Sequence, residues 1–122
     1  MNALDRGIAV AVVLFVVLGM AAIAAAQSEE GVANFYNDSF QGKKTASGEP
    51  YDKSGLTAAH KKLPFGTKVK VTNVENGKSV VVTINDRMAA SKKAVIDLSR
   101  HAADEIGFGK AGKAKVKLEI EK

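Results

Sequence analysis

The sequence of 122 residues contains no cysteine and only two histidines. Without cysteine, no disulfide can support the fold, and neither a thiolate zinc site nor a lipid-modified N-terminal cysteine can form. The two histidines, His60 and His101, lie forty-one positions apart, and they do not form the tight cluster of ligands that is typical of a metal site. Signatures of phosphate loops, dinucleotide sites and Ser/His/Asp triads are missing as well. The sequence therefore predicts a protein without a metal or another cofactor.

Arginines are scarce, and basic residues outnumber acidic residues. The formal net charge is +5, and all but three of the 18 basic residues are lysines. Diffuse lysines favour solubility and attraction to polyanions such as cell-wall polymers or anionic lipid head groups. Proteins that read nucleic acids instead combine arginine forks with stacking aromatic residues. We therefore expect no nucleic-acid partner.

One segment, residues 7–26, contains no charged residue. Arg6 precedes it and an alanine triplet ends it, which is the pattern of an export signal with small residues at its cleavage site. A run of about 20 apolar residues is also long enough to remain as a membrane anchor. Both alternatives place the rest of the chain in the periplasm or outside the cell. The sequence thus predicts a signal peptide or anchor over residues 1–26 and one folded domain over residues 27–122, which we expect to be a monomer.

Alternating apolar residues predict several short strands. The clearest pattern covers residues 68–86, where valines alternate with polar residues on both sides of an Asn-Gly turn, as is typical of a β-hairpin. In the second strand of this hairpin, alternate residues from Val80 to Ile84 share one face. Because side chains two positions apart point the same way, Asp86 is expected to continue this buried face to the rim of the fold.

The remaining elements indicate a mainly β fold with one helix. Residues 94–109 begin as a short apolar strand and become helical, with Ser99 as the N-cap and Gly107 as the stop. Five or six short strands of this kind favour a small closed barrel, because closure removes the exposed sheet edges. The further strands are expected over residues 31–38, 56–60 and 113–122.

Three titratable residues, Glu49, His60 and Asp86, stand where a long polar loop could bring them together at the mouth of such a barrel. Position alone favours plainer roles for all three. Asp86 can cap turn amides or pair with Arg87, and Glu49 and His60 can be ordinary surface groups. The residues alone therefore leave open whether these three side chains form a catalytic site or have only structural roles.

Two other polar residues are expected to serve the structure. Asp97 follows a short strand, where its carboxylate can accept hydrogen bonds from the amides at the helix start near Ser99. His101 falls on the solvent side of the expected helix, away from its apolar stripe. Neither is a candidate for catalysis.

Several motifs, in order along the chain, resemble the rare lipoprotein A family. They are Thr-Ala-Ser-Gly-Glu at residues 45–49, Ala-Ala-His at 58–60, Leu-Pro-Phe-Gly-Thr at 63–67, Asn-Asp-Arg at 85–87 and Ile-Asp-Leu-Ser at 96–99. The resemblance implies a double-psi β-barrel of six strands in an exported protein that acts on peptidoglycan. Some members of the family are lytic transglycosylases, which cleave glycan strands poor in stem peptides. Related barrels occur in expansins, so a non-catalytic module that binds cell-wall glycan is the alternative.

The resemblance also implies a set of site residues. It assigns catalysis to Glu49, His60 and Asp86, and substrate binding to residues in the same motifs. In this interpretation Asp86 is the acid that assists the leaving oxygen of the glycosidic bond, and it then acts as a base toward the 6-hydroxyl of the muramic residue. Glu49 and His60 would position the sugar, hold the proton or stabilise positive charge. The implied substrate-binding residues are Tyr36, Thr45 and Arg87.

The sequence departs from the pattern of the family next to the Asn-Asp-Arg motif. Met88 to Ser91 replace a Gly-Pro-Phe turn, and Ala94 replaces a basic residue before Ile-Asp-Leu-Ser. We expect an altered groove wall here, in which Lys92 and Lys93 compensate in charge.

Overall fold

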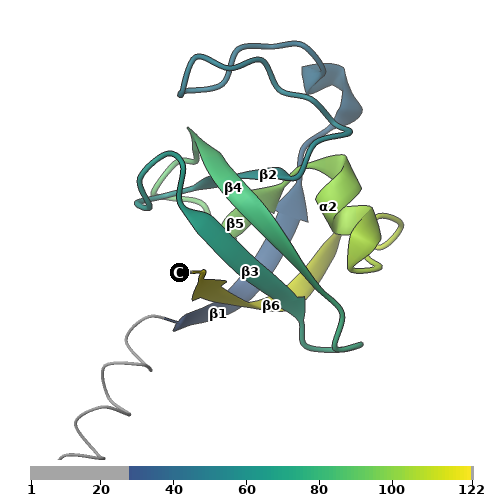
Figure 1. Ribbon diagram of the computed structural model, residues 1–122. Helices are drawn as coiled ribbons and strands as arrows, with labels where there is room; N and C mark the ends of the chain where they lie inside the picture. The colour runs from purple at the N-terminus through teal and green to yellow at the C-terminus, as the bar shows by residue number, and fades with distance from the viewer. Residues whose placement is uncertain (1–27, 122) are drawn as a thin grey trace, which may run out of the picture.

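The computed structural model describes residues 28–121, which form a barrel closed by six strands (Figure 1). The predicted mainly β fold with a closed barrel is confirmed. The predicted signal or anchor segment lies outside the described residues. No helix within residues 28–121 is long and apolar enough to cross a membrane. The elements are β1 (Ser28–Phe35), η1 (Asp38–Phe40), β2 (Thr57–His60), β3 (Lys68–Asn73), β4 (Ser79–Arg87), β5 (Ile96–Leu98), α2 (Arg100–Glu105) and β6 (Lys113–Ile120).

The order of the strands around the barrel is β1-β5-β2-β4-β3-β6. The predicted hairpin is present, since β3 and β4 pair antiparallel. Two pairs, β1 with β5 and β2 with β4, are parallel and join segments that are distant in the sequence. The short strand β2 therefore lies between β4 and β5, so that residues from three segments meet around it.

The core of the barrel consists mainly of alanine, valine, isoleucine and leucine side chains. The alternation in β3 and β6 places one face of each strand inside, while the lysines of both strands point outward. Helix α2 covers one opening of the barrel, with Ala102 and Ala103 fully buried. As predicted, the Ser99 hydroxyl caps this helix by accepting a hydrogen bond from the Ala102 amide, and Gly107 follows it at a φ of 81°.

A β-bulge in β4 changes the direction of the Asp86 side chain. Ala58 of β2 lies opposite Ile84 of β4, but the next residue, Ala59, lies opposite Asp86. Asn85 is thus an extra residue in β4, and Asp86 takes the outer face that it shares with Ala59. The prediction that Asp86 continues the buried face of Ile84 is wrong, because the bulge shifts the alternation by one residue.

The segment between β1 and β2 arches over one end of the barrel (Figure 1). It contains the short turn η1 and the isolated bridge between Lys44 and Pro50. Tyr51 anchors this segment, because its ring stacks on Tyr36 with 4.3 Å between ring centroids. The Tyr51 hydroxyl also accepts a hydrogen bond from the Arg100 amide, which ties the arch to α2.

Candidate functional site

A groove of about 470 Å³ lies where the ends of β1, β4 and β5 meet over Ala59 of β2. The small side chain of Ala59 leaves room between the strands on either side of it. The loop that follows β4 forms one wall, and the start of the arch forms another. Residues that line the groove include Tyr36, Phe40, Asp86, Met88, Lys92 and Asp97.

Asp86 is held in the groove by three donors. Its Oδ1 accepts hydrogen bonds from the backbone amides of Ala46 and Arg87, each at 2.8 Å. Its Oδ2 accepts a hydrogen bond of 2.5 Å from the Tyr36 hydroxyl. Because a backbone amide only donates, Oδ1 has no room for a proton of its own. A proton on Asp86 must therefore sit on Oδ2, beside the one partner that can also accept a hydrogen bond.

Tyr36 is fixed on both sides of its ring. It stacks on Tyr51, and it forms an edge-to-face contact with Phe40 at 5.9 Å between ring centroids. Burial raises the pKa of the Tyr36 hydroxyl far above its ordinary value, and the hydrogen bond and negative charge of Asp86 raise that pKa further. Tyr36 therefore keeps its proton at any physiological pH.

Asp97 faces the same groove from the other side of Ala59. Ala59 of β2 pairs with Asp86 of β4 on one side and with Asp97 of β5 on the other. The backbones of the two acidic residues are therefore separated by two strand spacings, about 10 Å. The Oδ2 atom of Asp97 forms an ion pair with Lys92 at 3.1 Å. Its Oδ1 atom is buried and has no hydrogen-bond partner within the described part of the chain.

The expectation that Asp97 accepts hydrogen bonds from the helix start is wrong, because those amides donate to the Ser99 and Tyr51 hydroxyls and to the Lys53 carbonyl. Asp97 is therefore a groove residue that is not among the predicted site residues. A signal was present in the alternation of β5, since Ile96 and Leu98 are buried and Asp97 must point to the opposite face. Lys92 supplies the basic group next to Asp97, in agreement with the expected compensation for Ala94.

Thr45 contributes to a smaller hollow of about 170 Å³ that shares Tyr36 and Asp86 with the groove. Its hydroxyl lies 2.9 Å from the Ser47 hydroxyl and donates to the Glu49 carbonyl at 2.7 Å. Thr45 thus stabilises the tip of the arch beside Asp86.

Arg87 lines the groove but directs its guanidinium elsewhere. Nη1 donates to the carbonyls of His60 and Leu63 at 3.1 and 2.8 Å. The group also lies over the Phe65 ring, 4.6 Å from its centroid. These contacts hold the turn after β2 against the end of β4.

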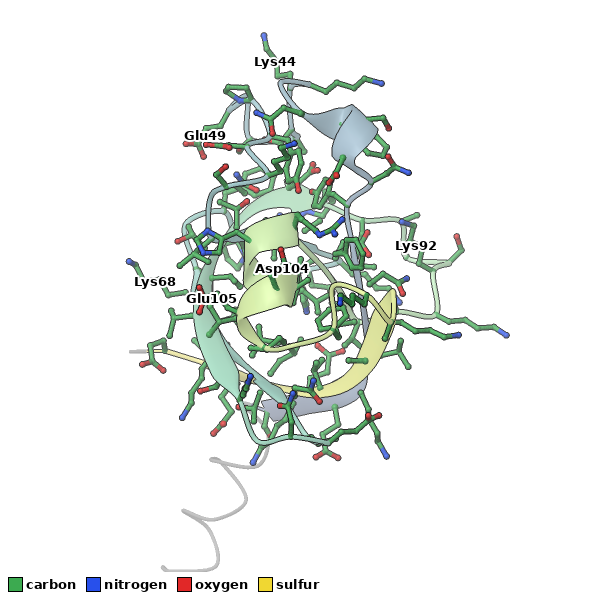
Figure 2. All side chains as sticks on the ribbon, turned by 90° about the vertical axis from the view of Figure 1, so that its right-hand side faces the viewer. Lys44, Glu49, Lys68, Lys92, Asp104 and Glu105 are labelled. Atoms are coloured by element: carbon green, nitrogen blue, oxygen red, sulfur yellow. The ribbon has the colours of Figure 1, made fainter. Side chains whose placement is uncertain are left out.

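The structure does not bring Glu49 and His60 to Asp86. The His60 ring lines a separate hollow of about 130 Å³ with Glu29, Leu63 and apolar residues of β3 and β6. Glu49 is exposed on the arch and does not line the groove, and Figure 2 shows its side chain well apart from that of Lys92. Of the predicted site residues, Asp86 and Tyr36 meet directly, and Thr45 and Arg87 support them.

Residues 28–121 contain no group of three or more His, Asp or Glu side chains placed to hold a metal ion. The titratable side chains that line the groove include two carboxylates, one tyrosine and one lysine. Such a set suits proton transfer to and from a neutral polar substrate in an open groove.

The sequence matches known proteins over nearly the whole described region. The pattern of the lytic transglycolase family covers residues 28–118. A probable endolytic peptidoglycan transglycosylase RlpA of Synechocystis is 52% identical over 90 residues, which are 74% of this chain and 28% of that protein. The endolytic peptidoglycan transglycosylase RlpA of Pseudomonas aeruginosa strain UCBPP-PA14 is 51% identical over 89 residues, 73% of this chain and 26% of that protein. This chain thus corresponds to roughly a quarter of the length of these two relatives.

Solved structures share the fold at low sequence identity. The Streptomyces papain inhibitor has a TM-score of 0.63 and 23% identity, over 79% of this chain and 96% of that one. A mutant expansin of Clavibacter michiganensis in complex with cellohexaose has a TM-score of 0.61 and 18% identity, over 78% of this chain and 50% of that one. These similarities support the fold, a six-stranded double-psi β-barrel, and nothing beyond the fold.

Proposed function

The chain belongs to the lytic transglycolase family, and from that membership we propose that it is an exported peptidoglycan lytic transglycosylase. It would cleave strands of alternating MurNAc and GlcNAc and leave an anhydro product, as a monomeric domain over residues 27–122. The observation that carries this proposal is the placement of Asp86 in an open groove with one oxygen beside the Tyr36 hydroxyl.

Asp86 is proposed as the acid of the first step. Its proton, on Oδ2, passes to the oxygen that joins C1 of MurNAc to C4 of GlcNAc. The bond between C1 and that oxygen breaks, GlcNAc leaves with a free 4-hydroxyl, and positive charge develops on the MurNAc ring. Asp86 is left as a carboxylate that the two backbone amides and Tyr36 stabilise.

In the second step the same carboxylate acts as a base. It removes the proton from the 6-hydroxyl of the MurNAc residue, and O6 forms a bond to C1 of the same sugar. The internal hydroxyl replaces water at high effective concentration, so neither a water molecule nor a second nucleophilic carboxylate is consumed. The proton returns to Asp86, which restores the starting state.

Tyr36 and Asp97 support these steps in different ways. Because its pKa is raised, Tyr36 remains a neutral hydroxyl that accepts from the acid form of Asp86 and donates to the ionised form. Asp97 presents a second carboxylate across Ala59, where negative charge would stabilise the cation on the sugar ring. Lys92 holds Asp97 in place by their ion pair.

Digestion of purified sacculi and of peptide-free glycan tests this function. Wild-type protein should release soluble fragments that end in 1,6-anhydro-MurNAc. The isosteric variant Asp86→Asn keeps the size of the side chain and cannot donate the proton, so release should fall by about a hundredfold to ten-thousandfold. Sacculi that bind the protein without release above the Asp86→Asn level would instead indicate a wall-binding module without catalysis.

A further inference from the structure

The two nitrogens of the His60 ring are both occupied. Nδ1 accepts hydrogen bonds from the backbone amides of Lys62 and Leu63 at 3.0 and 3.1 Å. Nε2 lies 3.0 Å from Oε1 of Glu29, and only 6% of the residue is exposed. Because amides only donate, Nδ1 must be unprotonated, and the proton of the neutral ring must sit on Nε2 and point to Glu29. The ring has no free nitrogen for a sugar.

The His60 ring also points away from the groove. In β2 successive side chains alternate, so that Ala59 pairs with Asp86 on the groove side and His60 pairs with Arg87 on the other. His60 reaches Asp86 through the backbone. Its carbonyl accepts hydrogen bonds from the Arg87 guanidinium and from the Met88 amide, on the two residues that follow Asp86.

These contacts form a clamp around the end of β4. The His60 ring shapes the turn at residues 61–63 through two amides, and the carbonyl of Leu63 in that turn accepts the shorter bond from Arg87. The clamp fixes β4 directly after the bulge at Asn85. The bulge is what turns the Asp86 carboxylate to the outer face, so a loose clamp would let that carboxylate shift.

We propose that Glu29 and His60 are positioning residues, which place Asp86 through the clamp and do not touch the substrate. Glu29 fixes the tautomer, His60 fixes the turn, and Arg87 transmits the fixed turn to the end of β4. The effect on turnover rests on the proposed function, whereas the arrangement of the clamp does not. A displacement of the acid by about 1 Å is enough to cost on the order of a hundredfold in rate.

A comparison of His60→Asn with His60→Ala tests the proposal. The Oδ1 of asparagine stands at the same branch position as Nδ1 of histidine and accepts hydrogen bonds from following backbone amides, whereas alanine offers no acceptor. We expect His60→Asn to keep kcat within about threefold of wild type and His60→Ala to lose about a hundredfold, with little change in KM for either. Asparagine has no group that titrates near neutral pH, so an unchanged pH profile in His60→Asn excludes a proton-transfer role for His60.

A catalytic His60 gives the opposite pattern. Both variants would then lose activity alike, and His60→Asn would lose one limb of the pH profile. Either result overturns the proposal, provided that the variants keep an intact thermal unfolding transition. Glu29→Gln is the second variant, because its amide oxygen still accepts from Nε2 while the charge is removed. It should retain activity, and a loss equal to that of His60→Ala would contradict the positioning role.

NMR tests the clamp without any reference to activity. The nitrogen shifts of His60 should show a proton on Nε2 and none on Nδ1, and a proton on Nδ1 would overturn the proposal. The Ala46 amide, which donates to Asp86, should shift in His60→Ala and stay in place in His60→Asn. If wild-type protein releases no product, the proposed function fails, and these shifts still decide whether the clamp positions Asp86.

Discussion

At the scale of single residues, the pair of Asp86 and Tyr36 determines what the groove can do. The family resemblance implies that Asp86 is the acid, and the structure adds the three donors around its carboxylate. Two of these donors come from residues fifty and forty positions away. Contacts over such distances depend on the closed fold, and no local pattern in the sequence predicts them.

Removal of the Tyr36 hydroxyl measures its share in the reaction. The variant Tyr36→Phe keeps the stack on Tyr51 and loses the hydrogen bond to Oδ2. A hydrogen bond to a charged group contributes about 1.5–3 kcal/mol, so the release of anhydro product should fall by about 10- to 100-fold. Equal rates for Tyr36→Phe and wild type, measured on peptide-free glycan, would show that the hydroxyl takes no part.

His101 gives a prediction about pH. The bond between its Nδ1 and the Ser54 carbonyl raises its pKa above the ordinary value of 6.5, and the Glu105 carboxylate raises it further. The folded-state pKa is raised, so the stabilisation is fully present below the unfolded-state pKa and is lost as the pH rises through the folded value. NMR titration should place the midpoint above 6.5 and, in Glu105→Gln, closer to 6.5. A wild-type midpoint at or below that value would contradict the contact.

At the scale of elements, alternation in the sequence predicted most strands, but it placed the first at residues 31–38, whereas β1 spans residues 28–35, and it failed at the bulge. The hairpin of β3 and β4, the capped helix and the last strand were all recognised from period and cap residues. The bulge at Asn85 was missed, because a bulge is defined by the pairing of two strands. The sequence of β4 alone does not show that Asn85 has no partner in β2. The partner is β2, and its parallel pairing with β4 was not predictable from local pattern.

The cap of α2 tests how the elements are held together. The Ser99 hydroxyl accepts from Ala102 and donates to the Gly55 carbonyl at 2.7 Å, so it ties the helix to the arch as well as capping it. Ser99→Ala should lower the free energy of unfolding by about 1–2 kcal/mol, measured by urea denaturation. The exposed Ser91 provides the matched control, and Ser91→Ala should have no effect. Equal stability of the two variants would refute the double role of Ser99.

At the scale of the whole molecule, a short chain without cysteine places an acid in an open groove by closing a barrel. The many short strands, whose edges would otherwise be exposed, were enough to predict closure. The convergence of Glu49, His60 and Asp86 was expected from sequence motifs. Motifs show which residues are adjacent in the sequence, but they do not show where the side chains point. The strand order brings Asp86 and Asp97 to one face over Ala59, while His60 is directed to another hollow.

In the proposed mechanism Asp86 transfers a proton and no water is consumed. Digestion of peptide-free glycan in water enriched in heavy oxygen, followed by mass spectrometry of the new chain ends, tests it most directly. We predict anhydro ends without heavy oxygen from wild type and almost none from Asp86→Asn. Ends that carry heavy oxygen would contradict ring closure by the 6-hydroxyl, and anhydro ends formed equally by Asp86→Asn would contradict proton transfer by Asp86.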